Sequence, residues 1–480
     1  MSTCFSCLAQ DNNNTQLVAN FKNYFNKRLT DSIYMQWSEQ AKKAVVKSQL
    51  DTLLEKQLYP LGDIQSLSFI KQQGAFSHYK LAFKNTALQL IVSADSTNKV
   101  ETFYFKPYIE PLEANTVQQQ NQPDTSRAIA SNPDSIAPTN ASNENESTID
   151  LLIDSLALNY TTMPTTSGLA IGLIANGKTN YYYYGETTQR NNVLPDKETL
   201  FEIGSITKTF TATLLARAVL QGTIKLADPI LKYLPDSVAQ NENLAGITFQ
   251  NLATHTAGLP RLPSNLASDE TLDPYKDYDV NALFSYLKHY KQHQKPDSLY
   301  EYSNLGYGII GELLAQQYHL SYSELIEKEI CKPLGLVNTT EFPDSDKLQD
   351  FIPTYNKEGD LTPHWHFQAL SGAGSLKSTV ADLLKYAEAN LNIQKTPLGN
   401  AIALTHKPSW LVSETQDLGL AWHINIEDFQ EIFWHNGSTL GSSSFLAFVP
   451  GKNIAIVVLA NAAQAVDNIG FAIIRKLIEQ

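Results

Sequence analysis

The segment from residue 109 to residue 147 limits what this chain can fold into, because it cannot join an apolar core. It is rich in Gln, Asn, Ser, Pro and Asp and has almost no apolar side chains. Such a composition buries too little apolar surface to offset the entropy of ordering the backbone, so it predicts a disordered linker. The chain of 480 residues is then expected to fold as two parts, residues 11–108 and residues 148–480.

The part before the linker, residues 11–108, is predicted to be a small α+β accessory domain. Apolar side chains recur at helical spacing over residues 16–58, and Pro60 and Gly62 end this pattern. Residues 67–108 then alternate between apolar and polar side chains, as short antiparallel strands do. No charged cluster here has a catalytic pattern, so we expect a role in partner binding or self-association.

The first ten residues, 1–10, are interpreted as the remnant of a signal peptide. Phe5 to Ala9 resembles the apolar end of such a signal with its cleavage site, but the basic segment that begins a signal is missing. An ordinary disordered start is the alternative. A signal predicts a periplasmic or secreted protein, and a lipid anchor on Cys7 is a further alternative.

The composition excludes several classes of protein. The formal charge of −13, from 36 basic and 49 acidic residues, argues against a nucleic-acid or anionic-membrane partner. No apolar run reaches the length of a membrane span. The three cysteines, Cys4, Cys7 and Cys331, provide neither a disulfide framework nor a metal cluster, and Cys331 is expected to be buried.

The part after the linker, residues 148–480, has the pattern of a mixed α/β fold. Apolar runs at its two ends predict an antiparallel sheet flanked by helices, and the middle predicts a helical subdomain. Asn176-Gly177 between two such runs is typical of a hairpin turn. Strands are predicted at 168–174, 179–185, 418–426, 432–435, 444–449 and 454–460, and helices at 149–160, 205–220, 280–291, 305–330, 379–392 and 471–478.

A Ser-x-x-Lys step, Ser205 to Lys208, begins an apolar helix that ends before Gly222. Residues three apart share a helix face, so the Lys208 amine can lie beside the Ser205 hydroxyl. A serine hydroxyl needs such a neighbour to become a useful nucleophile. The unpaired N–H groups at the helix start suit a developing oxyanion.

Two further motifs carry polar side chains that suit the same reaction. Tyr302-Ser303-Asn304 offers a phenol whose pKa a nearby lysine ammonium would lower, and an amide that can both donate and accept. His435-Asn436-Gly437-Ser438 follows a short apolar strand, and Gly437 would allow a substrate backbone to approach closely. Each motif alone is equally compatible with an ordinary polar loop.

Together the three motifs resemble the signature elements of the serine β-lactamase and penicillin-binding-protein family. The branch is similar to class C β-lactamases and the related D,D-peptidases and esterases. The stretch Leu252 to Pro260, with His255-Thr256-Ala257-Gly258, supports the same resemblance, which spans residues 148–480. It implies a β-lactamase/transpeptidase-like fold and no metal or organic cofactor.

The resemblance also implies roles for these residues. Ser205 would form an acyl-enzyme, and Lys208 and Tyr302 would share the duty of the base. Asn304 would orient the acyl side chain and Lys208. His435 would contact a substrate carboxylate, and the Ser438 N–H would join the Ser205 N–H in holding the oxyanion.

One departure leaves the substrate open. Class C β-lactamases carry Lys-Thr-Gly in the third motif, where this chain has His435-Asn436-Gly437. A neutral histidine grips a carboxylate less well than lysine does. The implied substrates are a β-lactam, a D-Ala-D-Ala peptide of peptidoglycan or an ester, and a penicillin-binding or sensor-type protein with slow turnover is the alternative.

Overall fold

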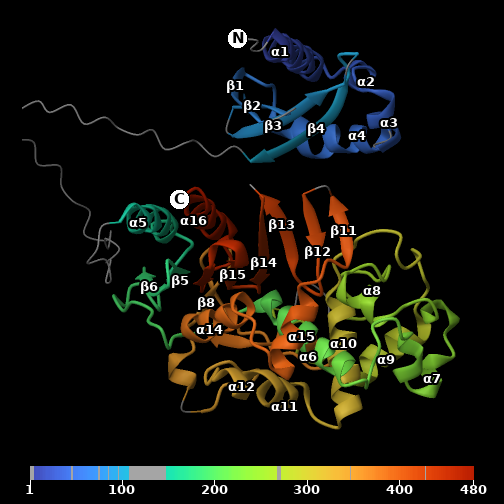
Figure 1. The fold of residues 1–480 in the computed structure, drawn as a ribbon, viewed down its shortest axis with the longest axis vertical. Helices are drawn as coiled ribbons and strands as arrows, with labels where there is room; N and C mark the ends of the chain where they lie inside the picture. Colours follow the sequence, from blue (N-terminus) through green and yellow to red (C-terminus); the bar gives the residue numbers. More distant parts are fainter. Residues whose placement is uncertain are drawn as a thin grey trace, which may run out of the picture. The chain divides into compact units, whose positions relative to one another are not determined.

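The computed structural model (Figure 1) describes residues 5–44, 47–73, 76–84, 86–95, 97–107, 147–266, 272–345, 347–413, 415–427 and 429–480. The chain divides into two compact units, residues 1–129 and residues 130–480, which are considered separately below. The predicted linker, except Ser147, lies outside the described residues, as do residues 1–4 of the predicted signal remnant.

The first unit is a small α+β fold, as its sequence predicts. Its described residues form helices α1 (Phe5–Asn26), α2 (Thr30–Met35), α3 (Glu39–Ala44) and α4 (Lys47–Leu53), followed by an antiparallel sheet. The strands are β1 (Ser66–Gln73), β2 (Phe76–Ala82), β3 (Ala87–Ala94) and β4 (Val100–Pro107), and they pair in chain order. Phe21 and Phe25 of α1 are buried in one core with Leu81 and Leu90 of the sheet.

An eight-stranded antiparallel sheet forms the centre of the second unit within the described residues. Its order is β11-β12-β13-β14-β15-β16-β5-β6, so the first strands of the unit pair with the last. The bounds are β5 (Leu169–Ala175), β6 (Lys178–Tyr184), β11 (Trp410–Ser413), β12 (Gln416–Leu418), β13 (His423–Glu427), β14 (Gln430–Ser438), β15 (Ser443–Val449) and β16 (Ile454–Ala460).

Helices cover both faces of this sheet. Successive side chains of a strand point to opposite faces, so a strand that is apolar throughout needs a packing layer on each side. Helices α5 (Thr148–Thr161) and α16 (Asp467–Ile478) pack on the face that carries Leu169, Ile171 and Leu173. Helix α14 (Val380–Leu391) packs on the other face, where a Cβ on Gly172 would lie 3.1 Å from Leu384.

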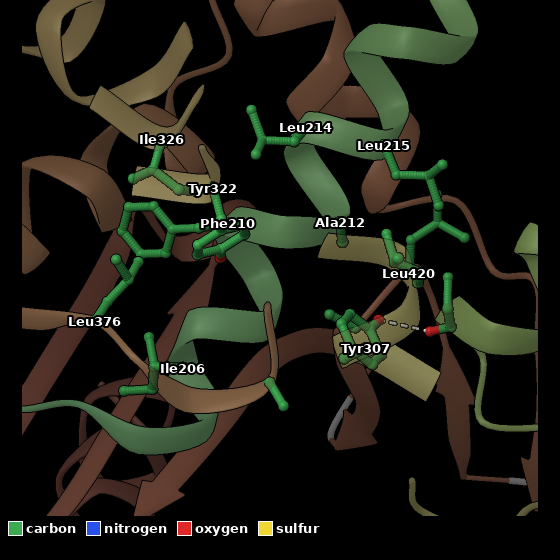
Figure 2. Packing of buried hydrophobic residues seen from close by; sticks show 14 of the residues in the cluster. Ile206, Phe210, Ala212, Leu214, Leu215, Tyr307, Tyr322, Ile326, Leu376 and Leu420 are labelled. Atoms are coloured by element: carbon green, nitrogen blue, oxygen red, sulfur yellow. Dashed lines mark hydrogen bonds between the residues drawn. The ribbon is translucent and has the colours of Figure 1, made fainter. Parts of the chain in front are cut away.

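Helix α6 (Thr207–Leu220) is the centre of the helical subdomain. It is buried on nearly all sides, which is why its sequence is apolar or small around the whole turn. Figure 2 shows Phe210, Ala212, Leu214 and Leu215 of α6 packed among side chains of later segments: Tyr307, Tyr322, Ile326, Leu376 and Leu420. This burial fixes the direction of the helix and therefore of the residues at its start.

Other helices of this subdomain surround α6, and Figure 1 shows α7 to α10 gathered on the side away from α5 and α16. Their bounds, with those of the remaining helices and short strands, are α7 (Asp236–Ala239), α8 (Phe249–Ala253), α9 (Val280–His289), α10 (Asn304–Tyr318), α11 (Tyr322–Ile326), α12 (Lys332–Leu334), α13 (Ser371–Gly374), α15 (Pro397–Thr405), β7 (Leu200–Glu202), β8 (Thr354–Tyr355), β9 (Leu361–Thr362) and β10 (Lys377–Thr379).

Two predicted elements are broken in the structure. The helix predicted over 305–330 ends at His319, whose φ of 55° is left-handed, and Ser321 begins α11 with a capping box to Glu324. The strand predicted over 418–426 is two strands, β12 and β13, joined by a turn in which Ala421 has a φ of 70°.

Two expectations from composition agree with the structure. Cys331 is 2% exposed, and burial raises the pKa of its thiol to about 12. Among the helices of the described residues, none has both the length and the apolar character needed to cross a bilayer.

Candidate active site

Ser205 lies in a tight turn that connects β7 to α6. The turn Gly204–Ile206 is a short 3₁₀ helix, and Gly204 has a φ of 48°, which a glycine adopts without strain. Gly204 and Ile206 are buried while Ser205 is half-buried. The turn therefore presents the serine hydroxyl at the start of a helix that packing holds in place.

The Lys208 amine contacts the Ser205 hydroxyl. Lys208 is fully buried, and its Nζ lies 3.0 Å from Ser205 Oγ, 2.8 Å from Asn304 Oδ1 and 2.6 Å from the carbonyl oxygen of Ala373. Burial, and after it the charge of Arg261, holds the pKa of Lys208 well below its usual value. In these contacts Nζ donates to all three oxygens, and the lowered pKa makes it easier for the amine to give up one proton and then offer its lone pair to the proton of Ser205.

Tyr302 lies on the other side of the same amine. Lys208 Nζ is 4.9 Å from the centroid of the Tyr302 ring, and the Ser205 side chain is among the groups that act on the pKa of the phenol. Loss of solvent raises the pKa of Tyr302, although Ser205 and the charge of Arg261 act in the opposite direction. The expected lowering of this pKa is therefore wrong, because desolvation of the phenol itself outweighs the groups that lower it.

Ser303 sets the direction of its two neighbours. Its backbone is extended, with φ −125° and ψ 115°, and its side chain caps α10 by accepting a hydrogen bond from Gly306 N. The Ser303 hydroxyl donates to Pro260 O at 2.7 Å, and its backbone N–H donates to His255 Nδ1 at 3.0 Å. Because residues i and i+2 of an extended segment share a side, both Tyr302 and Asn304 point toward Lys208.

The third motif lies within a strand and does not follow one. Strand β14 continues through Ser438 and is an interior strand of the sheet, so the predicted end at residue 435 is wrong. A Cβ on Gly437 would lie 2.0 Å from Ile203 O and 2.9 Å from Ser205 N, and a Cβ on Gly204 would lie 2.7 Å from Ser438 N. Backbone contact thus brings the Ser438 N–H beside the Ser205 turn.

His435 is fully buried beneath this contact. Its Nδ1 lies 2.6 Å from Asn436 O, and its Nε2 has no partner among the described residues. Burial, followed by His423 and Lys208, holds the pKa of His435 well below its usual value. The imidazole is therefore neutral, and its contact with a substrate carboxylate stays a prediction.

Replacement of Gly437 by Ala is expected to lower the acylation rate about 100-fold, the effect of losing one oxyanion donor. The added methyl would collide with Ile203 O and push the backbone of β14 away from Ser205. The control is Gly246→Ala, where the nearest atom to the new methyl is Pro296 Cγ at 3.6 Å. Equal acylation rates in Gly437→Ala and the unchanged protein, measured with a chromogenic β-lactam or ester, would refute the expected role of this contact.

Two functional neighbours of Tyr302 are missed by sequence reasoning. The His255 ring stacks on Tyr302 at 4.4 Å, and the Arg261 guanidinium carbon lies 5.1 Å from the centroid of the same ring. Both belong to the segment 255–261, and the stretch Leu252 to Pro260, which supports the family resemblance, was the signal that could have pointed to them.

A cavity of about 500 Å³ adjoins the third motif. Ser205, Lys208 and Tyr302 do not line it, but Gly437 and Ser438 do. Its wall also carries Asn436, whose Nδ2 donates to Asp467 Oδ1 at 2.5 Å. No group of three or more His, Cys, Asp or Glu side chains in the described residues could hold a metal ion.

Fold, site and relatives together define the class of the protein: it is a serine hydrolase with a mixed α/β fold. The chain belongs to the Beta-lactamase family, whose family model matches residues 155–476. A β-lactamase of Pseudomonas fluorescens is 30% identical over 328 residues, which cover 62% of this chain and 88% of that protein.

Two further similar proteins are a D-alanyl-D-alanine carboxypeptidase and a class C β-lactamase of known structure. The D-alanyl-D-alanine-carboxypeptidase/endopeptidase AmpH of Escherichia coli (strain K12) is 29% identical over 308 residues, 61% of this chain and 79% of AmpH. The structure of a class C β-lactamase matches with a TM-score of 0.63 and 25% identity, covering 71% of this chain and 99% of that one.

Proposed function

We propose that this protein hydrolyses a β-lactam or a D-Ala-D-Ala peptide through an acyl-enzyme on Ser205. The observation that carries the proposal is the 3.0 Å contact between the Ser205 hydroxyl and a buried Lys208 amine. The other hydrogen-bonding positions of that amine are taken by Asn304 and Ala373. Relatives named β-lactamase and D-alanyl-D-alanine carboxypeptidase support these two substrate classes.

Acylation follows from these contacts. Ser205 Oγ bonds to the substrate carbonyl carbon while its proton passes to the lone pair of Lys208. The N–H groups of Ser205 and Ser438 hold the oxyanion that forms. When the carbonyl re-forms, the C–N bond breaks, and a proton passes through Tyr302 to the leaving nitrogen. Tyr302 suits this step because its raised pKa keeps the phenol protonated at neutral pH.

Deacylation uses the same groups in reverse order. A water molecule attacks the ester carbon of the acyl-enzyme, its proton passes to the Lys208–Tyr302 pair, and the Ser205 hydroxyl is restored. A slow deacylation step would make the protein a penicillin-binding or sensor-type protein. The neutral His435 favours this slow-turnover candidate, because a neutral imidazole binds a substrate carboxylate more weakly than a lysine ammonium does.

The test is covalent labelling of the full chain with a fluorescent penicillin and a fluorophosphonate. We expect an adduct on Ser205, located by peptide mass spectrometry, that is absent from Ser205→Ala. No adduct on Ser205 with either reagent would refute the proposal. Prompt loss of the penicilloyl group indicates a hydrolase, and an adduct that persists for hours indicates the slow-turnover candidate.

The cellular location of the protein is a proposal as well. We infer a periplasmic or secreted protein from the apolar run in residues 5–9 and from the peptidoglycan peptide among the proposed substrates. Fractionation of cells that express the full chain tests it, and recovery of all the protein in the cytoplasm would contradict it. Self-association through residues 11–108 remains a prediction that light scattering would check.

A further inference from the structure

The backbone of Arg261 is fixed beside the proposed acylation centre. It follows the turn Gly258-Leu259-Pro260, and its carbonyl oxygen accepts hydrogen bonds from Asn304 N at 2.9 Å and Leu305 N at 3.2 Å. The Ser303 hydroxyl donates to the preceding carbonyl, that of Pro260. The backbone of Arg261 is therefore fixed to the start of α10, the same segment that carries Tyr302 and Asn304.

The side chain of Arg261 places a positive charge against the catalytic phenol and in contact with solvent. Arg261 is exposed, and its guanidinium carbon lies 5.1 Å from the centroid of the Tyr302 ring. In the described part of the chain, ion pairs of arginine involve Arg28, Arg217 and Arg475, and none involves Arg261. A guanidinium on a fixed backbone that pairs with no described carboxylate is suited to bind a substrate carboxylate through two hydrogen bonds.

The other candidate cations of the site cannot supply this interaction. The Lys208 amine is fully buried and its three positions are occupied by Ser205, Asn304 and Ala373. His435 is fully buried and neutral. Among the described residues, Arg261 is thus the cation that a substrate can reach next to Tyr302.

We propose that Arg261 binds a carboxylate on the leaving-group side of the substrate and thereby selects carboxylate-bearing amides over neutral esters. The leaving-group side follows from Tyr302, which delivers the proton to the leaving nitrogen under the proposed function, on which this inference rests. A D-Ala-D-Ala peptide fits this arrangement because its leaving amino acid ends in a carboxylate.

Binding and kinetics together test this inference. In a Ser205→Ala background, we expect an acyl-D-Ala-D-Ala peptide with a free carboxylate to bind about 10- to 100-fold more tightly than the same peptide with an amidated end. Arg261→Gln should remove this difference, and Arg261→Lys should retain part of it because it keeps the charge but not the planar fork. Equal binding of the two peptides to the Ser205→Ala protein would overturn the inference, whether or not the enzyme turns them over.

Kinetics separate recognition from a general effect on the site. In the protein that keeps Ser205, Arg261→Gln should lower the ratio of kcat/KM for the carboxylate peptide to kcat/KM for p-nitrophenyl acetate about 10- to 100-fold, because the effect of its charge on Lys208 and Tyr302 is common to both substrates. The control is Arg190→Gln, which removes another exposed arginine and should change neither value. An equal fall for both substrates would mean that Arg261 acts only through Lys208 and Tyr302, and would refute carboxylate recognition.

Discussion

Replacement of Lys208 by Met is expected to lower the rate of Ser205 acylation by about 10³- to 10⁴-fold, at the upper end of what one general base contributes. Met fills a similar volume but has no lone pair to take the Ser205 proton. The substitution also leaves Asn304 Oδ1 and Ala373 O without their donor, which costs about 1–3 kcal/mol for each oxygen that water cannot reach. Acylation by the chromogenic β-lactam nitrocefin or by p-nitrophenyl acetate, followed before the first turnover, measures the loss.

Lys377→Met is the matched control for this substitution. Lys377 is also buried, and its Nζ donates to Glu341 O at 3.1 Å and Trp365 O at 3.2 Å, so its loss carries a similar cost in stability. We expect this variant to keep the acylation rate within about tenfold once the folded fraction is known from urea unfolding curves. Equal losses of acylation in the two variants would show that the loss of a buried lysine side chain in general, and not of the lone pair beside Ser205, accounts for the effect.

The contacts within the site differ in how far the sequence could predict them. Ser205 and Lys208 are three residues apart on a helix, so their proximity follows from local geometry. Tyr302 and Asn304 could be proposed only as chemically suitable partners, because their approach depends on the packing of α10. The carbonyl of Ala373 could not be predicted at all, since a backbone acceptor leaves no signal in residue type.

The fold could be predicted where apolar runs are long. The prediction failed where pairing with a neighbouring strand, and not the local sequence, decides the structure. Strands β5, β15 and β16 follow continuous apolar runs that the structure buries. The last residues of β14 are polar or glycine, with little intrinsic preference for a strand. They are held there by pairing with β15, in which Gly437 faces Ser444 and Ser438 faces Ser443. The burial that keeps His435 neutral has the same origin, so its charge could not be inferred from the motif.

Acidification from pH 6.5 to pH 4 is expected to lower the free energy of unfolding of the second unit by several kcal/mol, because this unit contains histidines that burial keeps neutral. Burial lowers the pKa of His406 to about 3 and that of His423 to about 4, and holds those of His255 and His435 well below the usual value. In this pH range the unfolded chain binds protons that the folded chain does not. The free energy of unfolding therefore falls as pH falls, by up to about 1.4 kcal/mol per pH unit for each such histidine.

His406→Gln isolates one of these contributions without touching Ser205 or its partners. The imidazole Nε2 lies 3.0 Å from Asn390 Oδ1, a partner that a glutamine amide can retain, although its packing on Phe433 and Phe448 is lost. We expect a lower stability at neutral pH and, between pH 4 and 6, a slope of stability against pH that is smaller by about 1.4 kcal/mol per unit. Urea unfolding followed by tryptophan fluorescence at several pH values measures this slope, with His289→Gln, which removes an exposed histidine, as the control. An unchanged slope in His406→Gln would mean that His406 gains its proton in the folded protein, and that burial at this position does not resist acid.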